Sequence, residues 1–285
     1  MTAPAVTSPP SAKAVDAATA IAALRQGLSD ENYLNLQVRR YLWILQTVQK
    51  QVPPGGRIGD IGAAPGHMSM MLKQMGYQVT AFDFAPDNDM WEQSPDGTFA
   101  ASLRARDIPL KHWDVEVEDP GSVPHNVNGE FDCVIFTEVL EHVYRYPFST
   151  VRQIANLLKP GGIFICTTPN RHSISSRLQG LLGKAVDTSL DLLRDAFPPH
   201  MRHVWLYTPK EVESVLRASN VEPIDTSVKN FYLWTTTISS HKILPYWSPR
   251  SLKQLLKPLL ALYLLFFPGS GQAVCCVGKK NAGKG

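Results

Sequence analysis

The chain has 285 residues, a length that allows one large domain or two small ones. Hydrophobic residues make up 44% and charged residues 19%, a balance typical of a soluble globular protein that excludes a mostly disordered chain. The formal net charge of +3 is too small to indicate nucleic-acid binding across the whole surface, so we expect no nucleic-acid partner.

The N-terminal part of the chain changes character twice. Residues 1–27 are rich in Ala, Pro, Ser and Thr and predict a disordered tail, with a short helix near Ala17–Leu24. Residues 28–56 predict an N-terminal helix that packs on the following domain, because apolar residues recur every three or four positions from Leu34 to Val48. A Pro-Pro-Gly-Gly run ends this helix.

Residues 57–231, together with 271–280, predict one α/β domain in which strands and helices alternate. The strands are apolar along most of their length, as in a parallel sheet that is buried on both faces. The expected strands are 58–61, 78–82, 108–113, 131–136, 163–168, 221–231 and 273–277. Helices are expected at 65–75, at 147–158 and after Thr208, whereas 86–106 is expected to be irregular.

Two insertions interrupt this pattern. Residues 171–207 follow the fifth expected strand, so we expect them to lie on the substrate side of the domain. Residues 232–270 are basic and apolar. The chain has no Asp or Glu after Asp225, and eight Lys and Arg give residues 226–285 a charge of +8, which leaves −5 for the rest. Residues 250–267 therefore predict either a cap or dimer contact, or a contact with an anionic membrane surface.

The most informative segment joins the first strand to a helix and reads Asp60-Ile-Gly62-Ala-Ala64-Pro-Gly66-His67. Its small residues allow the backbone to approach a ligand, and the helix N-terminus offers free N–H groups. A phosphate-binding P-loop needs GxxxxGK[ST], which is absent. A dinucleotide site needs GxGxxG, which Ala64 and His67 fit poorly. Two interpretations of this loop remain: it is either a purely structural turn or part of a binding site for S-adenosylmethionine.

This loop resembles motif I, DxGxGxG, of the class I S-adenosylmethionine-dependent methyltransferases, with Ala64 at the middle glycine position. A residue before proline is extended, so Ala64 does not need a positive φ. Four further segments resemble family motifs in the same order. They are Asp83 at the end of the second strand, Trp113-Asp114-Val115, Phe131–Val143 with its Glu138-Val-Leu-Glu141-His142 ending, and Leu157–Gly162.

The resemblance implies a doubly wound, seven-stranded, mostly parallel Rossmann-like sheet with an antiparallel last strand. It implies S-adenosylmethionine as the cofactor, with Asp83 accepting the ribose hydroxyls and Asp114 near the adenine amine. The implied cofactor-binding residues are Asp60, Gly62, Ala64, Gly66, Asp83, Phe84, Asp114, Val115 and Thr137. The alternatives are that Asp83 caps a helix and that Asp114 only solvates a loop.

Within this family the chain is most similar to the ubiquinone-biosynthesis O-methyltransferases and to relatives that act on lipids, glycans and secondary metabolites. The resemblance therefore implies O-methylation of a small-molecule, lipid or glycan acceptor, with N-methylation as the near alternative. The Gly-Ala-Ala-Pro-Gly loop is also similar to RNA ribose methyltransferases, but strand four ends in Thr137-Glu138 and no RNA-binding module is apparent. A non-catalytic scaffold with this fold is a third possibility.

Methyl transfer to a hydroxyl needs alignment and a base, and no covalent nucleophile. Four of the eight histidines, His142, His172, His200 and His203, are candidate bases, and we predict His203 and His142 as catalytic residues. The carboxylates and imidazole of the Glu138–His142 ending suit a divalent cation or a helix cap. We predict no metal site.

Three further features bear on the compartment. The four cysteines form no Cys-x-x-Cys pair and lie in apolar runs, which indicates buried, reduced thiols. No apolar run reaches the roughly 18 residues of a membrane span, and the N-terminus lacks the pattern of an export signal. We expect a cytoplasmic protein, peripheral on the membrane if 250–267 binds lipid. The oligomeric state is left open.

Overall fold

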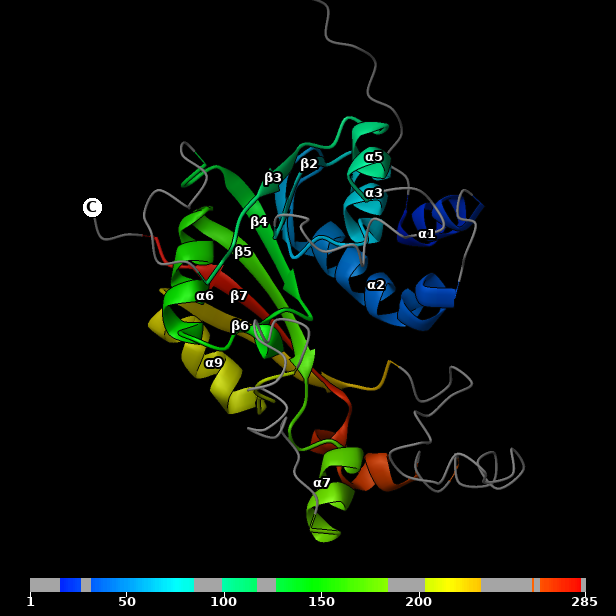
Figure 1. Cartoon of the computed structure of the whole chain (residues 1–285), viewed down its shortest axis with the longest axis vertical. Coiled ribbons are helices and arrows are strands. Elements are labelled where there is room, and N and C mark those ends of the chain that lie inside the picture. Colours follow the sequence, from blue (N-terminus) through cyan, green and yellow to red (C-terminus); the bar gives the residue numbers. More distant parts are fainter. Residues whose placement is uncertain are drawn as a thin grey trace, which may run out of the picture.

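The computed structural model describes residues 16–26, 32–84, 99–116, 127–183, 203–231, 258 and 262–282. They form a twisted seven-stranded sheet with helices on both faces (Figure 1). Helices α1, α2, α3 and α5 cover one face, and α6 and α9 cover the other. The strands are β1 (Arg57–Ile61), β2 (Gln78–Asp83), β3 (Leu110–His112), β4 (Phe131–Thr137), β5 (Leu158–Pro169), β6 (Val221–Lys229) and β7 (Ala273–Lys280).

The strand order in the sheet is β3-β2-β1-β4-β5-β7-β6. β1 to β5 are parallel to one another, whereas β7 runs antiparallel to both β5 and β6. The doubly wound, mostly parallel sheet with an antiparallel last strand is therefore confirmed. Because β1 to β4 are parallel, their carboxyl ends meet at one edge, where open α/β sheets bind ligands.

The helices alternate with the strands as the sequence pattern predicts. They are α1 (Ala17–Gln26), α2 (Asn32–Gln51), α3 (His67–Gln74), α5 (Phe99–Arg104), α6 (Pro147–Asn156), α7 (Ile174–Leu181) and α9 (Pro209–Ala218), with short 3-10 turns η1 (Leu140–His142) and η3 (Pro268–Ser270). The capping box that opens α9 is present, since the Thr208 and Glu211 side chains each accept the other's backbone N–H.

The short helix expected near Ala17–Leu24 is present as α1, whereas the rest of the expected tail lies outside the described residues apart from Asp16. The Ala20 and Leu24 side chains of α1 are fully buried in the main core, where α1 packs against α2 and α3. One expectation about local structure was wrong. The stretch 86–106, expected to be irregular, contains α5, which buries Leu103.

The core lies on both faces of the sheet. One cluster packs α1, α2 and α3 on β1 and β2, and the apolar stripe of α2 supplies Leu34, Tyr41, Leu45 and Val48 to it. A second cluster packs α6 and α9 on β4 and β5. All four cysteines are buried and free, which confirms the prediction of inert core thiols.

The two insertions are described only in part. Of 171–207, the structure describes α7 and residues 203–207, which return to the sheet through a bridge between Asn170 and Tyr207. Of 232–270, it describes residue 258 and residues 262–270, so most of the predicted contact segment 250–267, including Arg250, Lys253 and Lys257, lies outside the described residues. Among the described helices, none is long and apolar enough to cross a membrane.

Candidate functional site

The loop between β1 and α3 is shaped by two glycines in the left-handed region. Gly62 has φ +71° and Gly66, at the N-terminus of α3, has φ +90°. A side chain at Gly62 would overlap the Cγ2 methyl of Val139, which follows β4. Gly62 is therefore required both by its own backbone conformation and by the close approach of the next loop. Ala64 is outside the left-handed region, as its place before Pro65 predicts.

Asp60 is buried inside β1, with 3% of its surface exposed. The Ser69 hydroxyl on α3 donates to its Oδ2 over 2.6 Å, so the strand is tied directly to the helix that follows the loop. Burial raises the pKa of Asp60 to about 6. A buried carboxyl of this kind is poised to bind a cationic group.

Asp83, the last residue of β2, fixes the conformation of the same loop from the neighbouring strand. Its Oδ2 accepts the Ala64 N–H and its Oδ1 accepts the Phe84 N–H, each over 2.8 Å. Burial raises the pKa of Asp83. Each carboxylate oxygen can accept a second hydrogen bond, so Asp83 still has acceptor capacity for a ligand. Phe84 follows it with 43% of its surface exposed.

Asp114 and Val115 follow β3 at the same edge. The backbone N–H of the buried Trp113 donates to the Asp83 carbonyl, which places this segment beside the end of β2. Asp114 Oδ1 accepts the Glu116 N–H over 2.9 Å, and this turn holds its carboxylate near the sheet. Val115 is half-buried against the second core cluster.

Glu116 connects this segment to the one that follows β4. Its Oε1 accepts the backbone N–H groups of Tyr144 and Arg145, over 2.6 and 2.9 Å. Burial raises the pKa of Glu116. Sequence reasoning did not find this residue, since its partners are remote in sequence.

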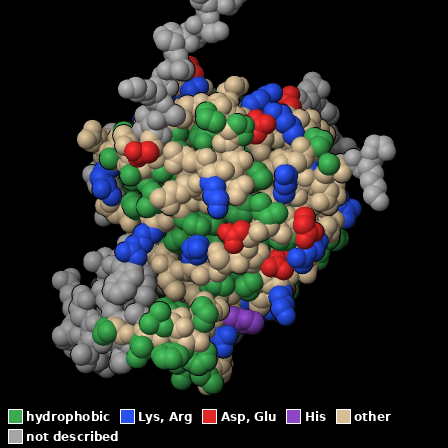
Figure 2. All heavy atoms as spheres, turned by 180° about the vertical axis from the view of Figure 1, so that it is seen from behind, with side chains coloured by type: hydrophobic (Ala, Val, Ile, Leu, Met, Phe, Trp, Pro, Cys, Tyr) green, Lys and Arg blue, Asp and Glu red, His purple; other side chains and the backbone are tan. Residues whose placement is uncertain are grey.

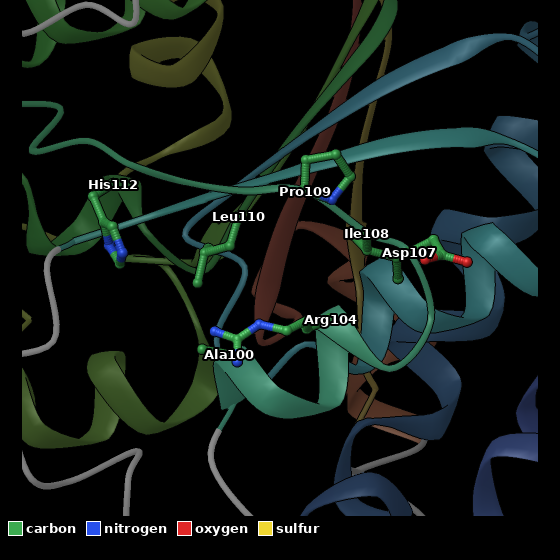
Figure 3. Close-up of a pocket in the computed structure, with 7 residues that line it drawn as sticks. All are labelled: Ala100, Arg104, Asp107, Ile108, Pro109, Leu110 and His112. Carbon is green, nitrogen blue, oxygen red and sulfur yellow. The ribbon is translucent and has the colours of Figure 1, made fainter.

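A cavity of about 480 Å³ lies at the β3 edge of the sheet (Figure 3). Ala100 and Arg104 of α5 and Leu110 and His112 of β3 surround it, together with the turn Asp107-Ile108-Pro109. His112 is the register partner of Asp83. None of the predicted site residues lines this cavity, which therefore neighbours the candidate site and does not contain it.

Thr137 ends β4, half-buried, opposite Thr167 of β5. The next residue, Glu138, has φ +58°, a conformation that costs a non-glycine residue free energy and needs support from its surroundings. Arg40 of α2 supplies that support with an Nη1–Oε2 distance of 2.6 Å, and the Thr167 hydroxyl donates to Oε1 over 2.9 Å. Arg40 was not found from the sequence, because α2 shows only the signal of a packing helix.

Glu141 is fully buried in η1. Its Oε2 accepts the Thr168 hydroxyl over 3.0 Å, and its carbonyl accepts the Val204 N–H over 2.7 Å. The second bond joins the end of the 171–207 insertion to the turn after β4. Burial, together with the nearby Glu138 carboxylate, raises the pKa of Glu141 well above its usual range.

The two predicted catalytic histidines meet at this junction. The rings of His142 and His203 are 4.9 Å apart and nearly perpendicular, although they come from different segments. His142 Nε2 lies 4.0 Å from Glu141 Oε1. Of the other two candidate bases, His172 lies in the turn just before α7, and His200 is outside the described residues.

Glu141, His142 and His203 also have the chemistry of a cation site. One possible ligand atom from each lies within 4.8 Å of the others. Imidazole and carboxylate groups bind divalent transition metals in many proteins. The predicted absence of a metal thus stays a prediction that must be tested.

The comparisons with known proteins agree with this geometry. A family model described as a methyltransferase domain matches residues 35–226. The chain belongs to this methyltransferase family. A curated relative, the ubiquinone biosynthesis O-methyltransferase of Ruegeria pomeroyi, is 31% identical over 194 residues, which cover 66% of this chain and 70% of the relative.

Solved structures show the same fold at low identity. A chain of the complex between the Haloferax volcanii Trm112 activator and a methyltransferase has a TM-score of 0.54 and 14% identity, covering 89% of this chain and 95% of that one. A Burkholderia thailandensis 1,6-didemethyltoxoflavin N1-methyltransferase with bound S-adenosylhomocysteine has a TM-score of 0.50 and 14% identity, covering 97% and 93%. The protein is an S-adenosylmethionine-dependent methyltransferase.

Proposed function

We propose that this methyltransferase methylates a hydroxyl oxygen of a small-molecule acceptor, with His203 as the general base and His142 as its neighbour. The observation that carries the proposal is the meeting of these two imidazoles, 4.9 Å apart, where the turn after β4 contacts the end of the 171–207 insertion. The relative from Ruegeria pomeroyi, named as an O-methyltransferase, supports oxygen as the acceptor atom.

In the proposed complex the loop residues bind the cofactor. Asp83 accepts the ribose hydroxyls with its remaining acceptor capacity, and Asp114 lies near the adenine amine. Asp60, Gly62, Ala64 and Gly66 surround the amino-acid end. Phe84, Val115 and Thr137 complete the contacts. These residues fit the group because all of them lie at or just beyond the carboxyl ends of β1 to β4, and because the Asp60 and Asp83 carboxylates, each already held by the protein, can accept further hydrogen bonds.

The cofactor supplies an electrophilic methyl group on a sulfonium, so that the S–CH₃ bond breaks as the O–CH₃ bond forms. The protein aligns the acceptor oxygen with that methyl group and takes up the hydroxyl proton. A neutral imidazole nitrogen of His203 receives the proton. The buried Glu141 helps to position this pair, since its backbone carbonyl holds Val204, the next residue after His203.

The acceptor class is tested by incubating the purified protein with labelled methyl donor and separated fractions of a cell extract. We expect label in the lipid or small-molecule fraction, in a product whose new methyl group is attached to oxygen. A labelled methyl group on nitrogen would show that the protein is an N-methyltransferase and would contradict O-methylation. Label confined to RNA would contradict the proposal.

A further inference from the structure

Two helical segments beyond the carboxyl edge of the sheet expose apolar side chains. Figure 2 shows hydrophobic side chains gathered at the bottom of the molecule, where Figure 1 places α7. Leu181 at the end of α7 is 85% exposed, and Leu265 and Phe266 of the helical residues 262–266 are 77% and 73% exposed. We call the following six side chains the apolar lobe: Leu181, Leu182, Leu262, Leu265, Phe266 and Phe267.

The apolar lobe is fixed to the sheet by a buried asparagine. Asn170, directly after β5, donates from Nδ2 to the carbonyls of Gly269 and Gly271, over 3.0 and 2.7 Å, and its backbone N–H donates to the carbonyl of Gln272. Because Asn170 also begins the segment that leads into α7, it holds the base of α7 beside the end of the second helical segment. The exposed apolar side chains therefore belong to a built feature of the fold.

The second helical segment has its own internal packing. The Tyr263 and Phe267 rings stack at a centroid distance of 4.6 Å, one helical turn apart. Tyr263 and Leu264 are half-buried, whereas Leu262, Leu265 and Phe266 point away from the protein with more than half of their surface exposed. Moving such large side chains from water into an apolar environment is favourable, and the isolated chain does not provide that environment.

Two arginines lie on the described segments that carry the apolar lobe. Residues 171–183 and 262–272 contain Arg171 and Arg177 and no Asp or Glu. Anionic lipid headgroups attract each nearby Lys or Arg by about 1 kcal/mol. A symmetric contact with a second copy of the chain would bring Arg177 and Arg171 close to their own copies with no acidic residue of residues 171–183 or 262–272 to oppose them, which favours an anionic membrane over a second copy.

We propose that the apolar lobe inserts into the surface of an anionic membrane. Leucine and phenylalanine side chains would enter the boundary between headgroups and acyl chains, while the surrounding cations contact the headgroups. α7 projects beyond the carboxyl edge of the sheet, the edge where Glu138 and His142 lie, so the candidate site would face the lipid. This attachment does not depend on the identity of the acceptor.

The test is sedimentation of the full-length protein with vesicles. Vesicles of phosphatidylcholine alone are compared with vesicles that contain about one third phosphatidylglycerol. The double variant Leu265→Gln/Phe266→Gln removes apolar surface from the lobe. Its matched control is Phe148→Gln/Ile224→Gln, on α6 and β6, where the exposed fractions are 48% and 49%.

We expect the wild-type protein to bind the anionic vesicles, and the lobe variant to bind them at least about tenfold more weakly. The control variant should bind like the wild type. Raising the salt from about 0.05 M to about 0.5 M should weaken binding several-fold, because it screens the headgroup attraction. Thermal unfolding of each variant verifies that it is folded, and Leu181→Gln replaces the double variant if that one is not.

Three outcomes would overturn the proposal. The first is that the wild-type protein does not sediment with anionic vesicles. The second is an equal loss of binding in the lobe and control variants. The third is that the wild-type protein does not bind vesicles but forms a dimer in sedimentation velocity, and that the lobe variant abolishes this dimer. This result would assign the lobe to a contact between two copies of the chain.

Discussion

Arg40 and Glu138 form an ion pair that joins helix α2 to the residue after β4. The Nη1–Oε2 distance is 2.6 Å, and the side chains are only 5% and 23% exposed. The pair supports a left-handed residue at the edge where the candidate site lies. α2 thus fixes the position of a site loop in addition to covering the sheet.

A double-mutant cycle with Arg40→Gln and Glu138→Gln tests this coupling. Removing either partner leaves a largely buried group without its counter-charge, so we expect each single variant to lose about 3 kcal/mol of unfolding free energy, with a coupling energy of about 2 kcal/mol. Denaturant unfolding measures both. The control is Lys159→Gln, because the Lys159–Asp132 pair has the same 2.6 Å distance but a lysine that is 43% exposed. It should lose less than about 1 kcal/mol, and an equal loss would contradict the assignment.

Gly62→Ala should be more destabilising than Gly76→Ala. Both glycines are left-handed, with φ +71° and φ +89°, so each substitution costs about 1–2 kcal/mol in backbone conformation. Only the new methyl group at position 62 would also overlap Val139, whereas position 76 is open. We expect about 1–3 kcal/mol more at position 62, measured by denaturant unfolding. Equal losses at the two positions would contradict the steric role assigned to Val139.

Asp60 should make the cofactor-free protein less stable as the pH rises. Its folded pKa is raised to about 6 by burial, so the native state holds a proton that the unfolded chain has already released. The stabilisation is fully present below about pH 4 and is lost as the pH rises to about 6, an effect of about 3 kcal/mol.

The variant Asp60→Asn keeps the shape of the side chain and removes the titratable carboxyl group. The difference in unfolding free energy between the variant and the wild type should therefore grow in favour of the variant between about pH 4 and pH 7. Denaturant unfolding at a series of pH values measures it. A difference that does not change with pH would show that folding does not raise the pKa of Asp60.

Asp83→Asn should weaken binding of S-adenosylmethionine and of its demethylated product by similar factors, at least about tenfold, since both carry the ribose. The amide group would also place its NH₂ against a backbone N–H of Ala64 or Phe84. Calorimetry with both ligands measures the two affinities. Asp225→Asn, on the exposed part of β6, is the control. Unchanged affinity in a folded Asp83 variant would remove this residue from the site.

His203→Gln should lower turnover by about 10² or more while leaving donor affinity unchanged, because a base acts on the acceptor. His172→Gln, in the turn just before α7, is the control and should retain activity. An equal loss of turnover and donor affinity would indicate packing.

Dialysis against a chelator distinguishes two possible roles of His203, that of a general base and that of a metal ligand. Turnover of the wild-type protein should survive dialysis against the chelator if His203 acts as the base. Loss of turnover that a divalent ion restores would instead assign Glu141, His142 and His203 to a cation and overturn the prediction of a metal-free site.

The sequence by itself determined the sheet and the position and shape of the loop between β1 and α3, because both depend on local patterns. Continuous apolar runs predict buried parallel strands, and the position of an acidic residue relative to a strand end decides which edge it reaches. Asp60 and Asp83 could therefore be placed correctly from their own strands. The left-handed conformations that their loop needs were also readable, since Gly62 and Gly66 occupy the two positions.

Only the tertiary structure decided how the remote segments combine. His142 and His203 meet because the Glu141 carbonyl holds Val204, a contact between segments whose sequences contain no mutual signal. Arg40 pairs with Glu138 because α2 packs across the sheet, and Gly62 is obligatory partly because Val139 approaches it from the next loop. α1 buries its apolar stripe against α2 and α3, a choice of partners that the stripe alone does not specify. Each of these depends on packing between elements far apart in the chain, which periodicity and motifs within one segment do not encode.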